Sequence, residues 1–279
     1  MRQPTGMVGR ALCDCHAHIF GPTRQYPLDV AADYRPAQAT VDDYRLMLDR
    51  LGIARCVLVQ PSVYGTDNRC LVDALRVLGD RAKGVAVISP DIPDEELLEL
   101  NRAGVCGIRL NTAAKNGMDL DALEPLAERI RPLGWHIQVL LTEDALIQSY
   151  RRLERLGCDV VVDHFALLNP HSFLASNGFR KLLDLLNGGN AWVKLSAPYL
   201  QGATTIDEFR AFSGLAQALS SARPDRLLWA TDWPHPAFKS GYLDDRTLLD
   251  ILDDWIPDPI TRLHVLEDNP QALYKFNQP

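Results

Sequence analysis

Three short polar segments of the chain carry histidine or aspartate directly after an apolar run. His16 and His18 are separated by one residue, and His164 and Asp232 stand in two similar settings further along. Imidazole and carboxylate groups are common zinc ligands, and they are also common general acids and bases. The residue types therefore predict one polar site that either holds a single divalent ion or acts directly on a substrate.

The apolar runs that precede these segments recur along the whole chain. Continuous rather than alternating hydrophobicity is typical of parallel strands that are buried on both faces. We predict eight such strands, at residues 11–20, 55–60, 84–89, 105–111, 136–141, 160–166, 191–197 and 227–233.

Amphipathic segments separate the predicted strands. Thr40 is suited to cap a helix that ends at Gly52, and similar patterns end at Gly134 and Gly157. Eight strands, each followed by a helix, are the count of a (β/α)8 barrel. An open doubly wound sheet is disfavoured because no glycine-rich nucleotide-binding pattern follows any predicted strand.

We therefore predict an α/β fold in which residues 11–279 form a single-domain TIM barrel. Residues 241–275 are expected to add two C-terminal helices, split by Pro257 and Pro259, against the last side of the barrel. Residues 1–10 have no apolar core segment, so they are expected to form a loose leader rather than a secretory signal.

Composition narrows the class of partner. The 279 residues are 47% hydrophobic and 23% charged, with a formal net charge of −7 and no run rich in lysine and arginine. Such a chain is poorly suited to bind nucleic acid, and it lacks the roughly 18 consecutive apolar residues of a membrane span. Its six cysteines form no C-x-x-C pair, which favours reduced thiols and a cytoplasmic location.

In a TIM barrel the chemistry is found at the C-terminal ends of the strands. Residues i and i+2 of a strand point to the same side, so His16 and His18 are expected to enter the barrel mouth together. Arg109 and Lys194 lie within apolar runs, where a buried charge needs a partner. Each is expected either to form a buried ion pair or to face an anionic substrate, and Lys115 in the loop after Arg109 could assist.

Four motifs resemble the amidohydrolase superfamily: DCHAHIFGP at residues 14–22, VDH at 162–164, VKLSAPY at 193–199 and TDWPHP at 231–236. More narrowly, they are similar to the branch of pyrone dicarboxylate lactonases and related lactone hydrolases. The resemblance implies hydrolysis of a small, anionic, carboxylated lactone. It also implies that Asp232 activates water while His16, His18 and His164 polarise the lactone carbonyl. The expected substrate contacts are Arg109, Lys115, Gln138, Ser196, Tyr199 and His235.

The motifs are compatible with more than one metal content of the site. The predicted fourth and fifth strands offer Arg109 and Gln138 where two-metal relatives have a bridging lysine or glutamate and a histidine, which disfavours a two-metal site. One Zn²⁺ on His16, His18, His164 and Asp232 is one alternative. Catalysis that requires no cofactor is the other, and the one we favour.

The substrate and the reaction class also have alternatives. Leu167 and Leu200 stand where the dicarboxylate lactonases use arginines, which predicts a monocarboxylated or less charged lactone. A zinc-dependent decarboxylase of a small aromatic or unsaturated acid is the second hypothesis. A barrel that only binds a small acid is the third, and the oligomeric state is not defined by the sequence.

Overall fold

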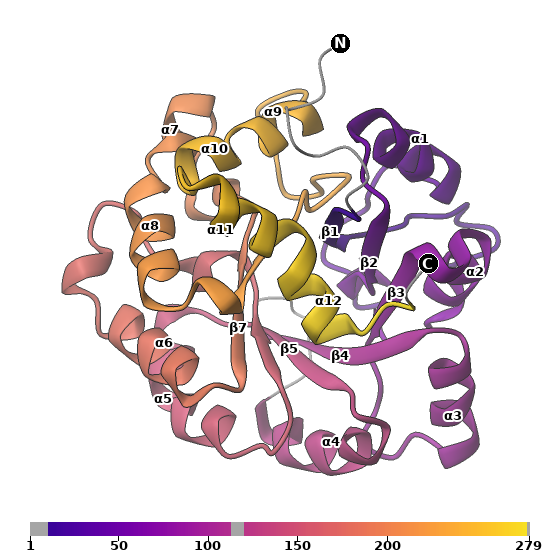
Figure 1. The fold of residues 1–279 in the computed structure, drawn as a ribbon. Helices are drawn as coiled ribbons and strands as arrows, with labels where there is room; N and C mark the ends of the chain where they lie inside the picture. Colours follow the sequence, from indigo (N-terminus) through magenta and orange to yellow (C-terminus); the bar gives the residue numbers. More distant parts are fainter. Residues whose placement is uncertain (1–10, 113–119, 278–279) are drawn as a thin grey trace.

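Eight parallel strands pair in chain order into one sheet, which forms a barrel surrounded by helices (Figure 1). The computed structural model describes residues 11–112 and 120–277, so the predictions for residues 1–10 and for Lys115 lie outside the described residues. The strands are β1 (Cys13–Ala17), β2 (Arg55–Val59), β3 (Ala82–Ala86), β4 (Val105–Asn111), β5 (His136–Leu140), β6 (Val160–Val162), β7 (Ala191–Leu195) and β8 (Leu227–Trp229). Their number and order confirm the predicted TIM barrel.

Helices lie outside the barrel, between successive strands (Figure 1). In α1 (Val41–Leu51) the Thr40 side chain accepts a hydrogen bond from the backbone N–H of Asp43, and Asp43 accepts one from Thr40 in return. Gly52 ends α1 in the left-handed conformation, with φ 73°, as predicted. The others are α2 (Arg69–Leu78), α3 (Asp94–Arg102), α4 (Leu123–Ile130), α5 (Glu143–Glu154), α6 (Asn177–Gly188), α7 (Ile206–Arg210), α8 (Ser213–Ala222), α9 (Asp245–Asp250), α10 (Leu252–Trp255), α11 (Pro259–Leu263) and α12 (Asn269–Tyr274). Within residues 11–112 and 120–277, no helix has the length and apolar character needed to cross a membrane.

The pairing of β1 with β2 slips between Asp14 and Ala17. Asp14 accepts a hydrogen bond from Tyr44 of the outer helix α1 at 3.0 Å, whereas His16 contacts Lys194 inside the barrel. Strict alternation would have placed Asp14 and His16 on the same side. The irregularity therefore turns His16 inward while Asp14 holds the outer layer, which is a common use of a bulge beside a functional site.

The barrel closes where β1 meets the segment after β8. The backbone N–H of His18 donates to Trp233 O at 2.7 Å, and that of Asp232 donates to His16 O at 2.9 Å. The Asp14 carboxylate accepts both the backbone N–H and the hydroxyl of Thr231, at 2.9 and 2.6 Å. These bonds join the two ends of the sheet and set Asp232 beside the His16–His18 pair.

Several strands are shorter than the apolar runs predicted. β6 ends at Val162 and β8 at Trp229, instead of residues 166 and 233, and the bounds of β1, β3 and β7 differ by two or three residues. Beyond β6 and β8 the backbone enters the left-handed region, with φ 53° at His164 and 59° at Asp232. Such residues cannot continue a strand, so these two side chains project from turns just past the strand ends.

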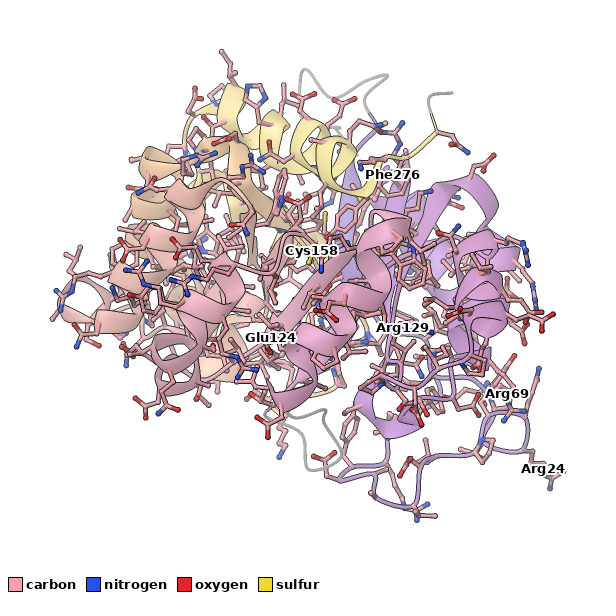
Figure 2. The ribbon with its side chains drawn as sticks, turned by 90° about the horizontal axis from the view of Figure 1, so that it is seen from below. Arg24, Arg69, Glu124, Arg129, Cys158 and Phe276 are labelled. Atoms are coloured by element: carbon pink, nitrogen blue, oxygen red, sulfur yellow. The ribbon has the colours of Figure 1, made fainter. Side chains whose placement is uncertain are left out.

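The first part of the C-terminal segment covers the last side of the barrel, as predicted, since Trp229 of β8 donates to Leu248 O and Trp255 to Phe209 O. The last part instead crosses the N-terminal end of the barrel (Figure 1). Helices α9 and α10 precede the break at Pro257 and Pro259, and α11, a π-helical turn (His264–Asp268) and α12 follow it. Leu273, Tyr274 and Phe276 form one apolar cluster with residues of six strands around the barrel, so they fill its interior at this end. Figure 2 shows Phe276 at this end and the loop carrying Arg24 at the opposite one.

Candidate active site

A cavity of about 310 Å³ opens at the C-terminal ends of the strands. Four of the predicted site residues line it: His18, Arg109, His164 and Asp232. The last residues of β4 and β5, Asn111 and Leu140, also line it. The segments after the strands supply the rest of the wall: Asp33, Tyr34, Pro61, Ser62, Leu200, Pro236, Ala237 and Lys239. The cavity therefore joins a buried polar floor to a rim built from several separate loops.

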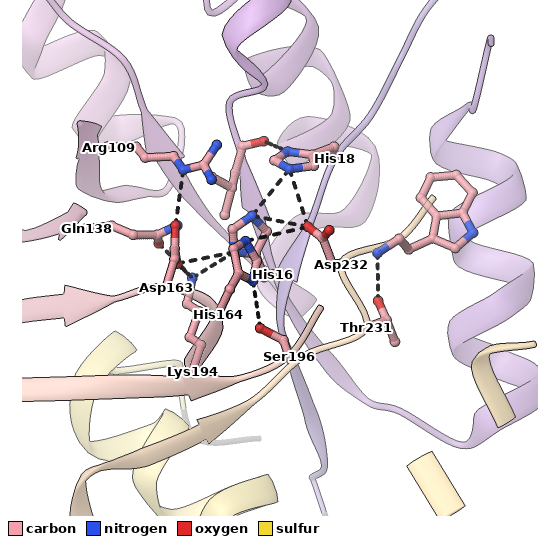
Figure 3. Close-up of polar contacts among 12 residues, drawn as sticks. His16, His18, Arg109, Gln138, Asp163, His164, Lys194, Ser196, Thr231 and Asp232 are labelled. Carbon is pink, nitrogen blue, oxygen red and sulfur yellow. Dashed lines mark hydrogen bonds and ion pairs between the residues drawn. The ribbon is translucent and has the colours of Figure 1, made fainter. Parts of the chain in front are cut away.

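The Asp232 carboxylate is held by one oxygen and leaves the other facing the histidines. Tyr199 donates its hydroxyl to Oδ2, whereas Oδ1 is buried without a hydrogen-bond partner. The Nε2 atoms of His16 and His18 each lie 3.6 Å from Oδ1, and that of His164 lies 4.0 Å away (Figure 3). A buried acceptor without a partner is costly, so this oxygen is suited to receive a proton from something that enters the site.

The three histidines are neutral at physiological pH. Burial lowers the pKa of His18 to about 4, and it lowers the pKa values of His16 and His164 below their usual range. The ring of His18 is oriented by a bond between its Nδ1 and Val59 O at 2.7 Å, and that of His164 by Ser196 Oγ at 2.9 Å. His16 and His18 also contact each other directly, Nε2 to Nε2, at 3.3 Å.

A fully buried carboxylate, Asp163, connects the floor of the cavity. Its Oδ2 accepts from Arg109 Nε at 3.2 Å and from Gln138 Nε2 at 3.0 Å, while Lys194 Nζ lies 3.3 Å from Oδ1 (Figure 3). Burial alone would raise the pKa of Asp163, but the positive charges of Lys194 and Arg109 outweigh it and hold the pKa well below the usual range. Asp163 therefore stays ionised and fixes the Arg109 side chain.

Arg109 and Lys194 were each predicted either to form a buried ion pair or to face an anionic substrate, and the two side chains differ in this respect. Lys194 is wholly buried and pairs with Asp163, so it belongs to a buried ion pair. Arg109 pairs with Asp163 through Nε and also lines the cavity. In Figure 3 its terminal nitrogens point away from Asp163, which is the arrangement needed to bind an anion in the cavity.

Four predicted substrate contacts lie outside the cavity wall and support other residues instead. Gln138 is bonded to Asp163 and Lys194, Ser196 to His164, and Tyr199 to Asp232. The Nε2 of His235 lies 3.0 Å from Asp245. The geometry thus gives these side chains positioning contacts.

Two loop residues of the cavity wall carry no signal in the sequence. Tyr34 and Lys239 come from the segments after β1 and β8, where no motif or periodicity marks a residue as functional. Only the rule that βα loops build the rim of such barrels could have directed attention to them. Asp163 was visible within the VDH motif, but its role as the connecting carboxylate depends on partners from three other strands.

The donor set fits a single divalent cation. One ligand atom each from His16, His164 and Asp232 lies within 4.8 Å of the other two, and the Oδ1 of Asp232 lacks a partner. Two nitrogens and a carboxylate oxygen are ligands that Zn²⁺ accepts, with His18 adjacent as a fourth. The neighbouring strands β4 and β5 contribute Arg109 and Gln138, neither of which is a ligand for a second ion.

Histidine and aspartate side chains at the strand ends of a TIM barrel are typical of hydrolase active sites. Comparison with known proteins identifies the family. The amidohydrolase family model matches residues 13–276, so the chain belongs to the amidohydrolase family. It is 34% identical over 272 residues to the 2-pyrone-4,6-dicarboxylate hydrolase of Comamonas testosteroni. The aligned region covers 94% of this chain and 89% of the relative.

Two further similarities agree with this assignment. The 4-sulfomuconolactone hydrolase of Hydrogenophaga intermedia is 31% identical over 274 residues, covering 94% of this chain and 88% of that protein. A solved structure of a probable 2-pyrone-4,6-dicarboxylic acid hydrolase from Acinetobacter baumannii, with citric acid bound, has a TM-score of 0.84 and 28% identity. The match covers 95% of this chain and all of that one (100%).

Proposed function

We propose that this protein is a hydrolase that opens a small lactone carrying at least one carboxylate. The observation that carries the proposal is the unpartnered Oδ1 of Asp232, which faces three histidine Nε2 atoms in a cavity that Arg109 also lines. The names of the relatives, a pyrone dicarboxylate hydrolase and a sulfomuconolactone hydrolase, support a lactone as the substrate class.

Hydrolysis requires a base for water and a donor for the carbonyl oxygen. Asp232 Oδ1 takes a proton from a water molecule as the water oxygen bonds to the lactone carbonyl carbon. Neutral histidine N–H groups stabilise the negative charge that develops on the carbonyl oxygen. The ring C–O bond then breaks, and the leaving oxygen takes the proton back from Asp232, so one lactone and one water yield one hydroxy acid or its keto tautomer.

Arg109 is the group that we assign to the substrate carboxylate. Asp163 holds its Nε, which orders the guanidinium before a substrate arrives. Leu200 lines the cavity where a second arginine would be needed for a dicarboxylate, and Lys239 lies only at the exposed rim. A single strongly bound carboxylate, with a less polar remainder, fits this wall.

We propose that these residues act without a resident metal. Lys194 Nζ lies 3.2 Å from His16 Nδ1, so a cation at His16 would share its ligand with a neighbouring ammonium group. If Zn²⁺ binds, His16, His164 and Asp232 would hold it, with His18 beside them. Zinc in such a site acts as a Lewis acid and lowers the pKa of bound water.

The test is a screen of carboxylated lactones by proton release, run on chelator-treated enzyme and again with added zinc. We expect turnover of at least one monocarboxylated lactone by the chelator-treated enzyme. Activity that appears only with stoichiometric zinc would overturn the metal-free proposal. Carbon dioxide release from an aromatic or unsaturated acid, with no lactone turnover, would instead show a decarboxylase.

Arg109→Ala tests the assigned carboxylate contact. Removing a charge-assisted hydrogen bond should raise KM by about 10- to 100-fold, with a smaller effect on kcat. Arg102→Ala, at the exposed end of α3, is the matched control and should leave KM unchanged. An unchanged KM in Arg109→Ala would remove the contact from the proposal.

A further inference from the structure

Four groups in the floor of the site form one continuous line of hydrogen bonds. Lys194 Nζ contacts His16 Nδ1 at 3.2 Å, His16 Nε2 contacts His18 Nε2 at 3.3 Å, and His18 Nδ1 contacts Val59 O at 2.7 Å. All three side chains are buried, with exposures of 0% for Lys194 and His16 and 4% for His18. Water therefore does not compete for these bonds.

The two ends of the line define the proton positions on both rings. A protonated lysine has donors and no acceptor. His16 Nδ1 lies nearer to Lys194 Nζ, at 3.2 Å, than to Asp163 Oδ1, at 3.4 Å, so we take it to accept from the lysine and to carry its proton on Nε2. A backbone carbonyl only accepts, so His18 must carry its proton on Nδ1 and present a lone pair at Nε2. The two neutral rings are thereby assigned opposite tautomers.

The middle bond is an independent check on this assignment. Two nitrogens 3.3 Å apart can form a hydrogen bond only when one carries a proton and the other a lone pair. The tautomers deduced from Lys194 and from Val59 meet that requirement, with His16 donating and His18 accepting. All three bonds point the same way along the line.

The surroundings of Lys194 match an ammonium group with three donors. Gln138 Oε1 accepts at 2.7 Å, His16 Nδ1 lies at 3.2 Å, and Asp163 Oδ1 lies at 3.3 Å. The Gln138 amide is oriented by its other end, which donates to Asp163 Oδ2. Each lysine proton therefore has a nearby acceptor, and one of these acceptors is an ionised carboxylate.

We propose that Lys194 is a positioning residue that holds His16 as its Nε2–H tautomer, so that the His16–His18 pair offers the cavity one donor and one acceptor. This inference rests on the proposed function for its consequence: when substrate enters, the Nε2–H of His16 turns from His18 to the carbonyl oxygen. His18 Nε2 is then free to accept a hydrogen bond from the water that Asp232 deprotonates. It also means that a divalent ion must displace the Nε2 proton of His16 before that nitrogen can bind it.

The direct test is the tautomeric state of His16 and His18 in the substrate-free wild-type protein. Long-range ¹H–¹⁵N spectra of ¹⁵N-histidine-labelled protein distinguish the two tautomers, and His16→Asn and His18→Asn identify the signals by their loss. We expect Nε2–H on His16 and Nδ1–H on His18. Observation of Nδ1–H or a doubly protonated ring at His16 would overturn the proposal.

Lys194→Met asks whether the lysine sets this state. Without the ammonium group, Asp163 Oδ1 loses its ion-pair partner, and His16 Nδ1, which lies 3.4 Å away, should donate to it. The Nε2–H signal should therefore give way to Nδ1–H. A folded Lys194→Met protein that keeps the Nε2–H tautomer would remove Lys194 as the cause.

Zinc titration gives a second readout on the same variant. Chelator-treated Lys194→Met should bind Zn²⁺ about tenfold more tightly than the wild type or more, because neither the ammonium group nor the Nε2 proton opposes the ion. Lys181→Met, which removes a partly exposed lysine that pairs with Asp184 on α6, far from the cavity wall, is the control and should bind zinc like the wild type. Equal zinc affinity in all three proteins would contradict the proposal.

These measurements separate this inference from the proposed function. The spectra and the zinc titration need no substrate, so they can succeed even if no lactone is turned over. Conversely, lactone turnover with His16 in the Nδ1–H form would preserve the hydrolase assignment and reject the role of Lys194. If Lys194→Met does not fold, the wild-type spectra alone still decide the tautomers.

Discussion

At the N-terminal end of the strands the barrel is filled by Leu273, Tyr274 and Phe276, whereas at the C-terminal end it opens onto a cavity lined by His164 and Asp232. Both ends are buried, yet one is packed with apolar side chains and the other concentrates ionisable ones. Apolar burial stabilises a fold, while buried polar groups lower its stability unless every partner is present. The comparison separates the part of the barrel that supports the structure from the part that supports chemistry.

The polar end also carries unfavourable backbone conformations. His164 and Asp232 both have positive φ, at 53° and 59°, and such non-glycine residues cost about 1–3 kcal/mol each. Asp232 Oδ1 is in addition left without a hydrogen-bond partner. The packing of the whole barrel, including its apolar end, offsets these costs and fixes the turns that carry His164 and Asp232.

The largest expected effect is on activity at the polar end. Asp232→Asn cannot take a proton from water, so kcat/KM for the lactone found in the screen should fall about 10²- to 10⁴-fold. The melting temperature should stay equal or rise, because the substitution removes an unpaired buried charge. Asp250→Asn, exposed on α9, is the control, and full activity in Asp232→Asn would assign the base elsewhere.

Stability is also affected at this end when the connecting carboxylate is changed. Asp163→Asn leaves Lys194 and Arg109 buried without a counter-charge and should lower the unfolding free energy by about 3–5 kcal/mol, measured by urea denaturation. Asp184→Asn breaks the exposed pair with Lys181 and should change little. Similar stability in the two variants would mean that the Asp163 network does not support the fold.

A substitution at the apolar end should lower stability and leave activity unchanged. Leu273→Ala leaves a cavity in the cluster that fills the barrel and should cost about 2–4 kcal/mol of unfolding free energy. Its kcat/KM, assayed well below the melting temperature, should match the wild type. A selective loss of activity would show that the two ends are coupled more strongly than their chemistry suggests.

The smallest expected effect is on the pH dependence of the unfolding free energy, and it concerns His136, a buried histidine at the apolar end. Burial lowers the pKa of His136 to about 3 in the folded state. In the unfolded chain the same histidine has its usual pKa of about 6.5, so between these two pH values only the unfolded chain binds the proton. Its contribution to stability is therefore complete above pH 6.5 and is lost as the pH falls toward 3.

His136→Gln removes this titrating group. Between pH 6.5 and pH 5 its unfolding free energy should fall by about 1.5 kcal/mol less than that of the wild type. Denaturation curves at the two pH values measure the difference. Parallel losses in both proteins would mean that His136 is protonated in the folded state.

The sequence was sufficient to predict the barrel and to identify the main polar residues at its strand ends. Continuous apolar runs, amphipathic segments and caps such as Thr40 and Gly52 are local signals, and they predicted eight strands with helices between them. The strand-end rule then brought His16, His18, His164 and Asp232 together from three motifs. Local patterns succeed here because burial on both faces leaves a direct mark on composition.

The sequence did not define how far the strands run or that the last helices cross the N-terminal end of the barrel. Apolar residues continue past Val162 and Trp229, although the backbone has already turned there, because a buried turn and a buried strand have the same composition. The final helices cross the N-terminal end of the barrel since only the assembled barrel exposes the apolar opening that Leu273 and Phe276 fill.

The sequence by itself determined which ionisable groups this protein would bring to one end of a TIM barrel. Only the tertiary structure decided what each of them does. The slip in β1 turns Asp14 outward and His16 inward. Contacts among Gln138 on β5, Asp163 directly after β6 and Lys194 on β7 hold these three side chains beneath the cavity. Proton positions and charges depend on contacts between distant residues, and no local pattern records such contacts.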